Sequence, residues 1–225
     1  MKYYLDITLL PDAEANLGFL WHKVYQQIHL MLVEHKVSSD DSAIALSFPQ
    51  YHAQQSKQSV KAFPLGDKLR LLAETEQQLI TLNVALCLAR FSDYVHIKAI
   101  KAVPSNVTEY AYFTRKHFKS PDKLRRGIDA RAAAIAHKNG FDVNEVKARL
   151  LASIDNLDKK SGLPFINLRS LSTNKEVSPE ERKKFLLFIE CQKVSEPSQN
   201  KGRFTCYGLS RRAPTEQAAV PWFEG

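Results

Sequence analysis

Apolar residues in the first hundred positions follow first the spacing of a strand and then that of a helix. Tyr3 to Leu10 alternates as a strand does and ends at Pro11-Asp12. Residues 15–36 carry large apolar side chains at helical spacing, which predicts one helix with a single buried face. This face consists of Leu17, Leu20, Trp21, Val24, Ile28 and Met31.

Four further elements are predicted before residue 104. They are a strand at Ala43–Phe48, a strand at Lys68–Leu72 after a polar loop at 50–66, a helix at Glu74–Phe91 and a strand at Tyr94–Val103. The order β-α-β-β-α-β is that of ferredoxin-like domains. We therefore expect an α+β protein whose residues 1–104 form a ferredoxin-like domain, with the boundary at Pro104-Ser105-Asn106.

Residues 105–225 are less regular, and we expect a carboxy-terminal region with a basic helix and short strands. Ser120-Pro121 is a favourable helix start, and Asn139-Gly140 ends that helix after Lys138. Asp142 can cap a second helix that reaches about Asp155. Later apolar runs predict three strands and an intervening polar loop: Pro164–Leu168, the loop Ser172–Lys184, Phe185–Cys191 and Arg203–Leu209.

Composition points to an anionic partner. The 225 residues carry a formal net charge of +8, with a pI of about 9.3, which is typical of proteins that bind nucleic acid or a membrane surface. No apolar run approaches the roughly 18 residues that a membrane span needs. Asp6 interrupts the apolar start and no small-residue cleavage site follows, so we expect no signal peptide.

The three cysteines do not form a metal-binding or disulfide pattern. Cys87, Cys191 and Cys206 are odd in number, belong to no CxxC motif and have no histidine at zinc-ligand spacing. We expect buried thiols in a reduced, cytoplasmic protein, without a metal site and without a cofactor.

Positive charge is concentrated between residues 112 and 138. Eight basic residues stand there against two acids, so this window holds +6 of the net +8: Arg115, Lys116, Lys119, Lys123, Arg125, Arg126, Arg131 and Lys138. Lys119, Lys123 and Arg126 fall on one face of the predicted helix. A cationic helix face of this kind fits the phosphate backbone of a duplex.

The same segment allows two other interpretations. The charges fit a solvated helix face in which Arg125 and Asp129 pair at i,i+4 spacing. A membrane-surface helix would need large apolar side chains beside its charges, whereas this segment has mostly Ala and Ile. The pattern favours nucleic acid and leaves the solvated face open.

Several segments, in the same order along nearly the whole chain, resemble the endoribonucleases that cut CRISPR repeat transcripts in subtype I-F systems. The run Phe204-Thr205-Cys206-Tyr207-Gly208-Leu209-Ser210 is the most specific of them. The others are Tyr4–Ile7 with Pro11-Asp12, His29, Ser47–Pro49, Arg115, Lys123–Arg126, Leu163–Phe165, Leu168–Ser170, Ser172-Thr173, Phe185–Ile189 and Val220–Phe223.

The resemblance implies a ferredoxin-like domain followed by a region with a basic helix. It implies recognition of a repeat-RNA stem-loop and metal-independent cleavage at the 3′ base of the stem. The products would carry a 2′,3′-cyclic phosphate and a 5′-hydroxyl. The protein would then stay on the mature guide RNA with the other subunits of the type I-F surveillance (Cascade) complex, a machine of antiviral defence.

The same resemblance assigns catalytic roles. Cleavage without a metal uses the 2′-hydroxyl of the RNA as nucleophile, and it needs a base and a group that positions the hydroxyl. The resemblance gives the base to His29, the positioning hydroxyl to Ser170 and the orientation of the histidine to Tyr207. Without the resemblance these would be a boundary histidine, an exposed strand serine and a core tyrosine.

For recognition, the resemblance assigns Arg115 to a guanine edge in the major groove of the stem and Phe185 to the terminal base pair. On its own, Phe185 would be a core strand residue. His117 stands where the family has an amide as a second base contact. Gly127 and Ala130 stand where the family has arginines, so phosphate contacts would come from the remaining cations: Lys119, Lys123, Arg125, Arg126 and Arg131.

Three hypotheses follow. The first is an endoribonuclease that processes a repeat RNA and keeps its product. The second is a non-catalytic RNA hairpin-binding subunit of a ribonucleoprotein, and the third is a binder of duplex DNA. The sequence favours the first, and it does not indicate which repeat is recognised or what the 172–184 loop does.

Overall fold

The computed structural model of the protein describes residues 1–52, 63–117, 124–160, 163–170, 184–196 and 203–223. The chain divides into two compact units, residues 1–116 with 163–225 and residues 117–162. The class is α+β with antiparallel sheets, as expected from the sequence. No helix among the described residues combines the length and apolar character that crossing a membrane requires.

The amino-terminal part of the first unit is a five-stranded antiparallel sheet in the order β3-β4-β1-β5, with β6 also paired to β1. The strands are β1 (Tyr3–Leu9), β3 (Ala45–Ser47), β4 (Lys68–Ala73), β5 (Val95–Ile97) and β6 (Lys101–Ala102). The predictions for the first three are confirmed. The predicted strand 94–103 is wrong in one respect, because it is divided into two short strands that pair with different ends of β1.

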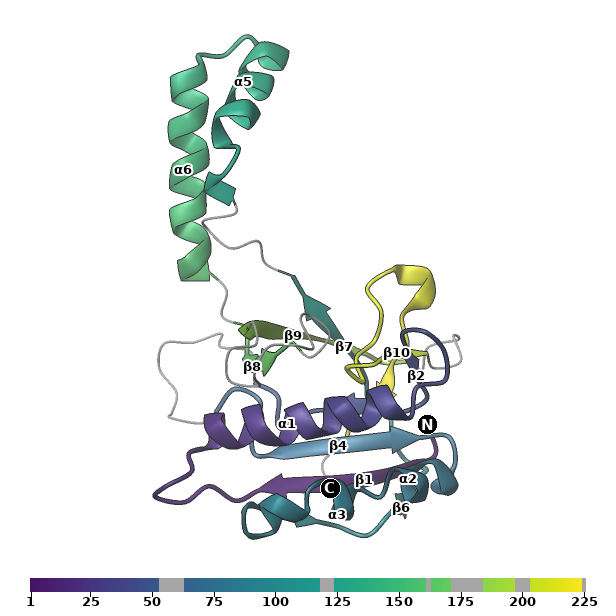
Figure 1. The fold of residues 1–225 in the computed structure, drawn as a ribbon. Helices are drawn as coiled ribbons and strands as arrows, with labels where there is room; N and C mark the ends of the chain where they lie inside the picture. The colour runs from purple at the N-terminus through teal and green to yellow at the C-terminus, as the bar shows by residue number, and fades with distance from the viewer. Residues whose placement is uncertain (53–62, 118–123, 161–162, 171–183, 197–202, 224–225) are drawn as a thin grey trace. The chain divides into compact units, whose positions relative to one another are not determined.

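Helix α1 (Leu17–Glu34) lies between this sheet and strand β8 of a second sheet (Figure 1). Its predicted apolar stripe is the buried face apart from Leu17, which is partly buried, and Tyr25 and Leu32 also belong to this face. Asn16 caps the helix by accepting a hydrogen bond from the Phe19 amide at 3.0 Å. The prediction of a helix at 15–36 is confirmed, with each end two residues shorter.

The predicted helix 74–91 is wrong as a single element. It consists of α2 (Glu76–Leu82), α3 (Val84–Cys87) and the 3₁₀ segment η1 (Ala89–Tyr94). Thr75 and Gln78 form a capping box at the start. Asn83 then adopts a left-handed conformation with φ of 46°, which ends α2 after two turns.

The second sheet of this unit has the order β11-β7-β9-β8. It consists of β7 (Tyr110–Lys116), β8 (Phe165–Arg169), β9 (Lys184–Val194) and β11 (Val220–Pro221), and a separate pair joins β2 (Asp41–Ser42) to β10 (Phe204–Thr205). The predictions of β8 and β9 are confirmed, and β7 was not predicted. The predicted strand 203–209 is wrong beyond Thr205, because Gly208 (φ 70°) turns the chain.

A buried ion pair connects the two ends of the first unit. Arg70 on β4 donates to both carboxylate oxygens of Asp6 on β1, at 2.6 and 2.9 Å. It also donates to the carbonyl of Phe223 at 2.7 Å, and its guanidinium lies 4.6 Å from the ring centroid of Tyr4 and 3.9 Å from that of Phe223. All three guanidinium nitrogens thus have partners, which offsets the desolvation of the buried charge.

The second unit is a helical hairpin of α5 (Ile128–Asn139) and α6 (Val143–Lys160). Ala132 and Ala136 pack against Val146 in a small core. Asp142 caps α6 as predicted, accepting from the Glu145 amide at 3.0 Å, although the helix continues past residue 155. The predicted single helix 120–138 is interrupted at Gly127 (φ 78°), and its predicted start at Ser120-Pro121 lies outside the described residues.

Candidate functional site

A half-buried histidine forms the centre of the candidate site. His29 lies on α1, and its Nδ1 is 2.9 Å from the carbonyl oxygen of Cys206. A carbonyl can only accept a hydrogen bond, so Nδ1 carries the proton. In the neutral ring the second nitrogen, Nε2, then keeps its lone pair and can act as a base.

The carbonyl that orients His29 belongs to a tight turn at residues 205–209. Gly208 donates to the Thr205 carbonyl at 2.7 Å, and Thr205 donates to the Leu209 carbonyl at 2.9 Å. The hydroxyl of Tyr25, one helical turn before His29, donates to the carbonyl of Tyr207 at 2.8 Å. Two side chains of α1 therefore hold consecutive carbonyls of the turn.

Three further side chains gather around the histidine. The Tyr207 ring stacks on the His29 ring, with centroids 4.3 Å apart and planes 3° from parallel. The Arg115 guanidinium lies 4.9 Å from the Tyr207 centroid and 5.1 Å from that of Phe185. Phe185 meets Tyr207 edge to face at 6.4 Å. We call His29, Arg115, Phe185 and Tyr207 the His29 cluster.

The surroundings of His29 favour its neutral form. Burial lowers the pKa of His29 below its usual value of 6.5, and the positive charge of Arg115 lowers it further. The hydrogen bond to the Cys206 carbonyl acts in the opposite direction and does not reverse the shift. At neutral pH the imidazole is therefore available to accept a proton.

Ser170 follows directly after β8, which runs beside α1. His22 Nδ1 lies 2.5 Å from the Asn167 carbonyl, and Gln26 Oε1 accepts from the Arg169 amide at 2.9 Å. Two residues of a strand span ~6.6 Å, and one turn of a helix spans ~5.4 Å. Strand β8 and helix α1 therefore run in the same direction with a similar rise from the first contact to the second. The half-buried Ser170 therefore continues the strand towards the turn of α1 that carries His29.

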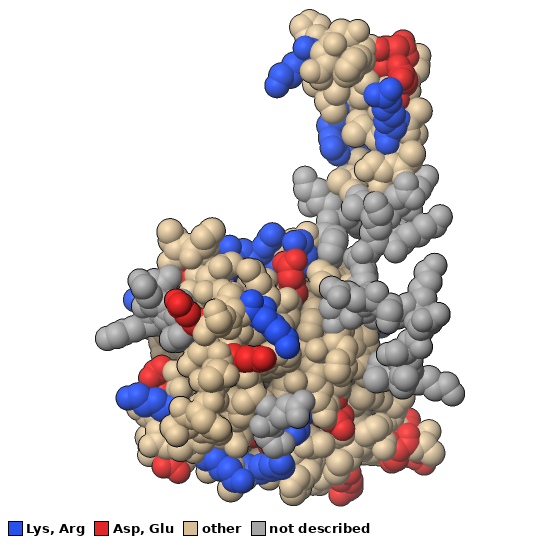
Figure 2. Space-filling model, turned by 180° about the vertical axis from the view of Figure 1, so that it is seen from behind, with Lys and Arg blue, Asp and Glu red and all other residues tan. Residues whose placement is uncertain are grey.

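The predicted phosphate contacts lie in the second unit. Arg125, Arg126 and Arg131 are exposed there, as is His117 at its start, while Lys119 and Lys123 lie outside the described residues. Asp129 pairs with Lys147 of α6 at 2.5 Å, and the suggested Arg125–Asp129 pair stays a prediction. Figure 2 shows Lys and Arg side chains on both units, with acidic side chains among them.

Sequence reasoning missed the residues that support the cluster. Tyr25 was not among the candidate site residues, although its position four residues before His29 places both on one helix face. The expectation of buried thiols is wrong, because all three cysteines are only partly buried, and the part of Cys206 in the site is its backbone carbonyl. Among the described residues no group of three or more His, Cys, Asp or Glu is arranged to hold a metal ion.

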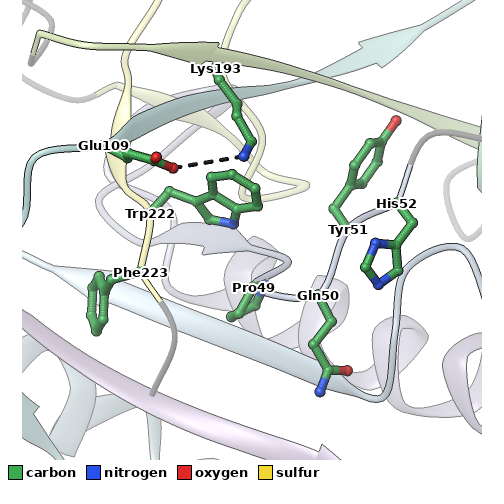
Figure 3. A pocket seen from close by; sticks show the side chains of 8 residues that line it. All are labelled: Pro49, Gln50, Tyr51, His52, Glu109, Lys193, Trp222 and Phe223. Atoms are coloured by element: carbon green, nitrogen blue, oxygen red, sulfur yellow. Dashed lines mark ion pairs between the residues drawn. The ribbon is translucent and has the colours of Figure 1, made fainter.

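A separate pocket of about 530 Å³ opens elsewhere on the first unit (Figure 3). The Lys193 ammonium lies 3.7 Å from the Trp222 ring centroid and 3.7 Å from a carboxylate oxygen of Glu109. The remaining lining residues are Pro49, Gln50, Tyr51, His52 and Phe223. This pocket shares no residue with the His29 cluster.

Comparison with known proteins bears on both the fold and the site. Residues 4–223 match the family described as CRISPR-associated protein (Cas_Csy4). The chain is 30% identical over 224 residues to the CRISPR-associated endonuclease Cas6/Csy4 of Pseudomonas aeruginosa (strain UCBPP-PA14), covering 99% of this chain and 100% of the relative. It is 28% identical over 226 residues to the Cas6/Csy4 endonuclease of Escherichia coli (strain UTI89 / UPEC), with the same coverage. These matches extend through every residue of the His29 cluster.

Proposed function

Because the chain belongs to the Cas6/Csy4 family of CRISPR-associated endonucleases, we propose that it binds the stem-loop of a CRISPR repeat transcript and cuts the RNA at the 3′ base of the stem. One observation carries the mechanism: His29 donates its Nδ1 proton to the Cys206 carbonyl, which leaves Nε2 as the base. The half-buried, neutral imidazole stacked on Tyr207 supports this role.

The proposed reaction uses the RNA's own 2′-hydroxyl. His29 Nε2 removes its proton while the Ser170 hydroxyl holds it in line with the phosphorus. The 2′-oxygen forms a bond to phosphorus and the bond to the 5′-oxygen breaks. That oxygen takes up a proton from water, and the proton on His29 returns to the solvent. The products are a 2′,3′-cyclic phosphate and a 5′-hydroxyl, and no step requires a metal ion.

RNA recognition uses both units in this proposal. Arg115 reads a guanine at the stem base, and Phe185 stacks on the terminal base pair, close to the scissile phosphate. Their contacts with Tyr207 support this placement. The exposed arginines of the second unit, together with Lys119 and Lys123, bind phosphates of the stem.

Three further statements belong to the same proposal. Residues 1–104 form a ferredoxin-like domain, supported by the strand order β3-β4-β1-β5 around the helices α1 and α2, and residues 105–225 form the RNA-binding region. The protein keeps the cleaved hairpin as a subunit of the type I-F surveillance complex. It works in the cytoplasm, which is consistent with its three free cysteines.

The test is cleavage of a stem-loop repeat RNA in EDTA. Wild-type protein should give a product with a 2′,3′-cyclic phosphate. His29→Ala should lower the single-turnover rate about 10²–10⁴-fold, the usual contribution of a general base, and leave RNA affinity nearly unchanged. His35→Ala is the matched control, because His35, the C-cap residue of the same helix, also bonds a backbone carbonyl, that of Met31 at 2.9 Å.

Other outcomes are equally informative. Unchanged cleavage by His29→Ala would mean that this histidine is structural. Tight binding of the hairpin by the wild type without any cyclic phosphate would favour a non-catalytic hairpin-binding subunit. Equal binding of an all-deoxy duplex competitor would favour a DNA binder.

A further inference from the structure

The four-stranded sheet has a second face, opposite the one that carries Arg115 and Phe185. Successive strand residues point to opposite sides, so Lys116 and Lys184 lie on this second face. Residues directly opposed across a ladder share a face. The pairs are Lys116 with Phe188, Phe165 with Phe188, Asn167 with Leu186, and Arg169 with Lys184. We call the group Lys116, Phe165, Arg169, Lys184, Leu186 and Phe188 the outer sheet face.

Large apolar side chains are exposed on the outer sheet face. Phe165 and Leu186 each expose 44% of their surface. The rings of Phe165 and Phe188 pack with centroids 5.4 Å apart and planes tilted by 54°. An exposed group of aromatic and aliphatic side chains on a rigid sheet is typical of a binding surface.

Cations border this apolar group at the end of the sheet nearest the candidate site. Lys116, Lys184 and Arg169 are the immediate chain neighbours of Arg115, Phe185 and Ser170. The acid on the same face, Glu190, pairs with Lys116 at 3.1 Å. The excess of positive charge favours a polyanion, and the aromatic ring favours one with planar bases.

The outer sheet face continues into a polar pocket of about 450 Å³ further along β7 and β9. Tyr112 faces Gln192 and Thr114 faces Glu190 across the ladder, and all four line the pocket with Arg212. Hydroxyl, amide and guanidinium groups of this kind can bond base edges and phosphates. An aromatic surface at one end and a polar pocket at the other form a track along the sheet.

We infer that the outer sheet face binds the single-stranded RNA that follows the scissile phosphate, the 3′ flank of the repeat stem. This inference rests on the proposed function, which puts the scissile phosphate at His29 and Ser170. Arg169 of the outer sheet face directly precedes Ser170 in the chain, so RNA that leaves the site in the 3′ direction starts beside this surface. The 5′ flank begins on the other strand of the stem.

The inference predicts a flank-dependent gain in affinity. Four RNAs are compared: the stem-loop alone, the stem-loop with a 3′ flank, with a 5′ flank and with both. Each carries a 2′-deoxy nucleotide at the cut, so it remains intact. The 3′ flank should tighten binding by about five- to a hundredfold, the contribution of one base stacked on an aromatic ring.

The double variant Phe165→Ala with Lys184→Gln should abolish that gain and leave the affinity for the bare stem-loop unchanged. Both residues are exposed, so the fold should tolerate the changes. Leu86→Ala with Arg90→Gln is the matched control, because it removes an exposed apolar residue and a cation from α3 and η1, away from this sheet.

A flank gain that survives the Phe165/Lys184 variant overturns the inference, as does the absence of any gain. The inference is also overturned if the Phe165/Lys184 variant loses an affinity gain from the 5′ flank and keeps the gain from the 3′ flank. It is likewise overturned if the Leu86/Arg90 control loses as much of the 3′-flank gain as the Phe165/Lys184 variant does. If the wild type fails to bind the bare stem-loop, the proposed function itself fails. That result is distinct, because it does not depend on the flank.

Discussion

At the scale of single residues, the Cys206 carbonyl decides which nitrogen of His29 carries the proton. The ring is held from one edge by this hydrogen bond and on one face by Tyr207, so its orientation is set before RNA arrives. Preorganisation of this kind lowers the entropic part of the barrier. Burial and Arg115 then keep the imidazole neutral, which is the form that a general base requires.

This arrangement predicts the pH dependence of cleavage. Only neutral His29 can accept the 2′-hydroxyl proton, so the single-turnover rate should rise with pH through the His29 pKa and then level off. Because that pKa lies below 6.5, the midpoint of the rate profile should also lie below 6.5. Arg115→Met removes a charge that lowers this pKa, so its midpoint should move to higher pH.

RNA binding measured at each pH serves as the control for acid unfolding. A midpoint above 6.5 in the wild type, or a profile without a rising limb, would contradict the assignment of His29 as base.

At the scale of elements, the turn at 205–209 packs closely against β3. Leu46 donates to the Gly208 carbonyl at 2.8 Å. A Cβ at Gly208 would lie 2.3 Å from Leu46 Cγ, and Gly208 has a φ of 70°. Only glycine fits both the backbone conformation and the space. The turn that presents the Cys206 carbonyl is therefore positioned by the central packing of the first unit.

The variant Gly208→Ala should destabilise the first unit by about 2–4 kcal/mol, combining the left-handed conformation with overpacking against Leu46. It should also slow cleavage, because the Cys206 carbonyl shifts. Unfolding in urea followed by tryptophan fluorescence reports this unit, since Trp21 and Trp222, the only two tryptophans, both lie in it.

Gly140→Ala is the matched control. Gly140 has a φ of 68°, but a Cβ there meets nothing within 4 Å, and the residue lies in the second unit. It should leave the tryptophan transition and the cleavage rate unchanged. Equal effects of the two substitutions would contradict the steric argument.

At the scale of the whole molecule, the net positive charge is distributed unevenly between the two units. Residues 117–162 hold ten Lys or Arg against six Asp or Glu, so the smaller unit carries half of the net +8. Its apolar core is small, made by Ala132, Ala136 and Val146 with two partly buried neighbours. A small helical hairpin with an excess of exposed cations is suited to binding a phosphate backbone.

RNA binding should therefore depend steeply on salt. Contacts with about six phosphates predict a slope of roughly −4 to −5 in a plot of log K against log salt concentration. Arg131→Gln should reduce the magnitude of the slope by about one. Arg149→Gln should change it little, because Arg149 already pairs with Glu145 at 2.5 Å. A slope near zero for the wild type would contradict electrostatic binding by this unit.

Much of the local structure could be predicted from periodicity and capping alone. The stripe on α1, the alternation in β1 and the cap at Asp142 act over a few residues, so they are visible in the sequence. The break at Asn83 and the strand β7 were missed. Asn83 lies inside an otherwise helical pattern, and β7 alternates buried residues such as Phe113 with half-buried aromatic and basic ones.

The sequence by itself determined the class of the protein, its basic character and, through the Phe204–Ser210 run and the other matching segments, its family. Only the tertiary structure brought His29, Arg115, Phe185 and Tyr207 together, because they come from one helix, two strands and a turn separated by 22 to 86 positions along the chain. The tertiary structure likewise determines that Nδ1 of His29 carries the proton. It depends on a carbonyl 177 residues away, and the backbone carbonyl is the same in every amino acid, so no side-chain pattern could predict it.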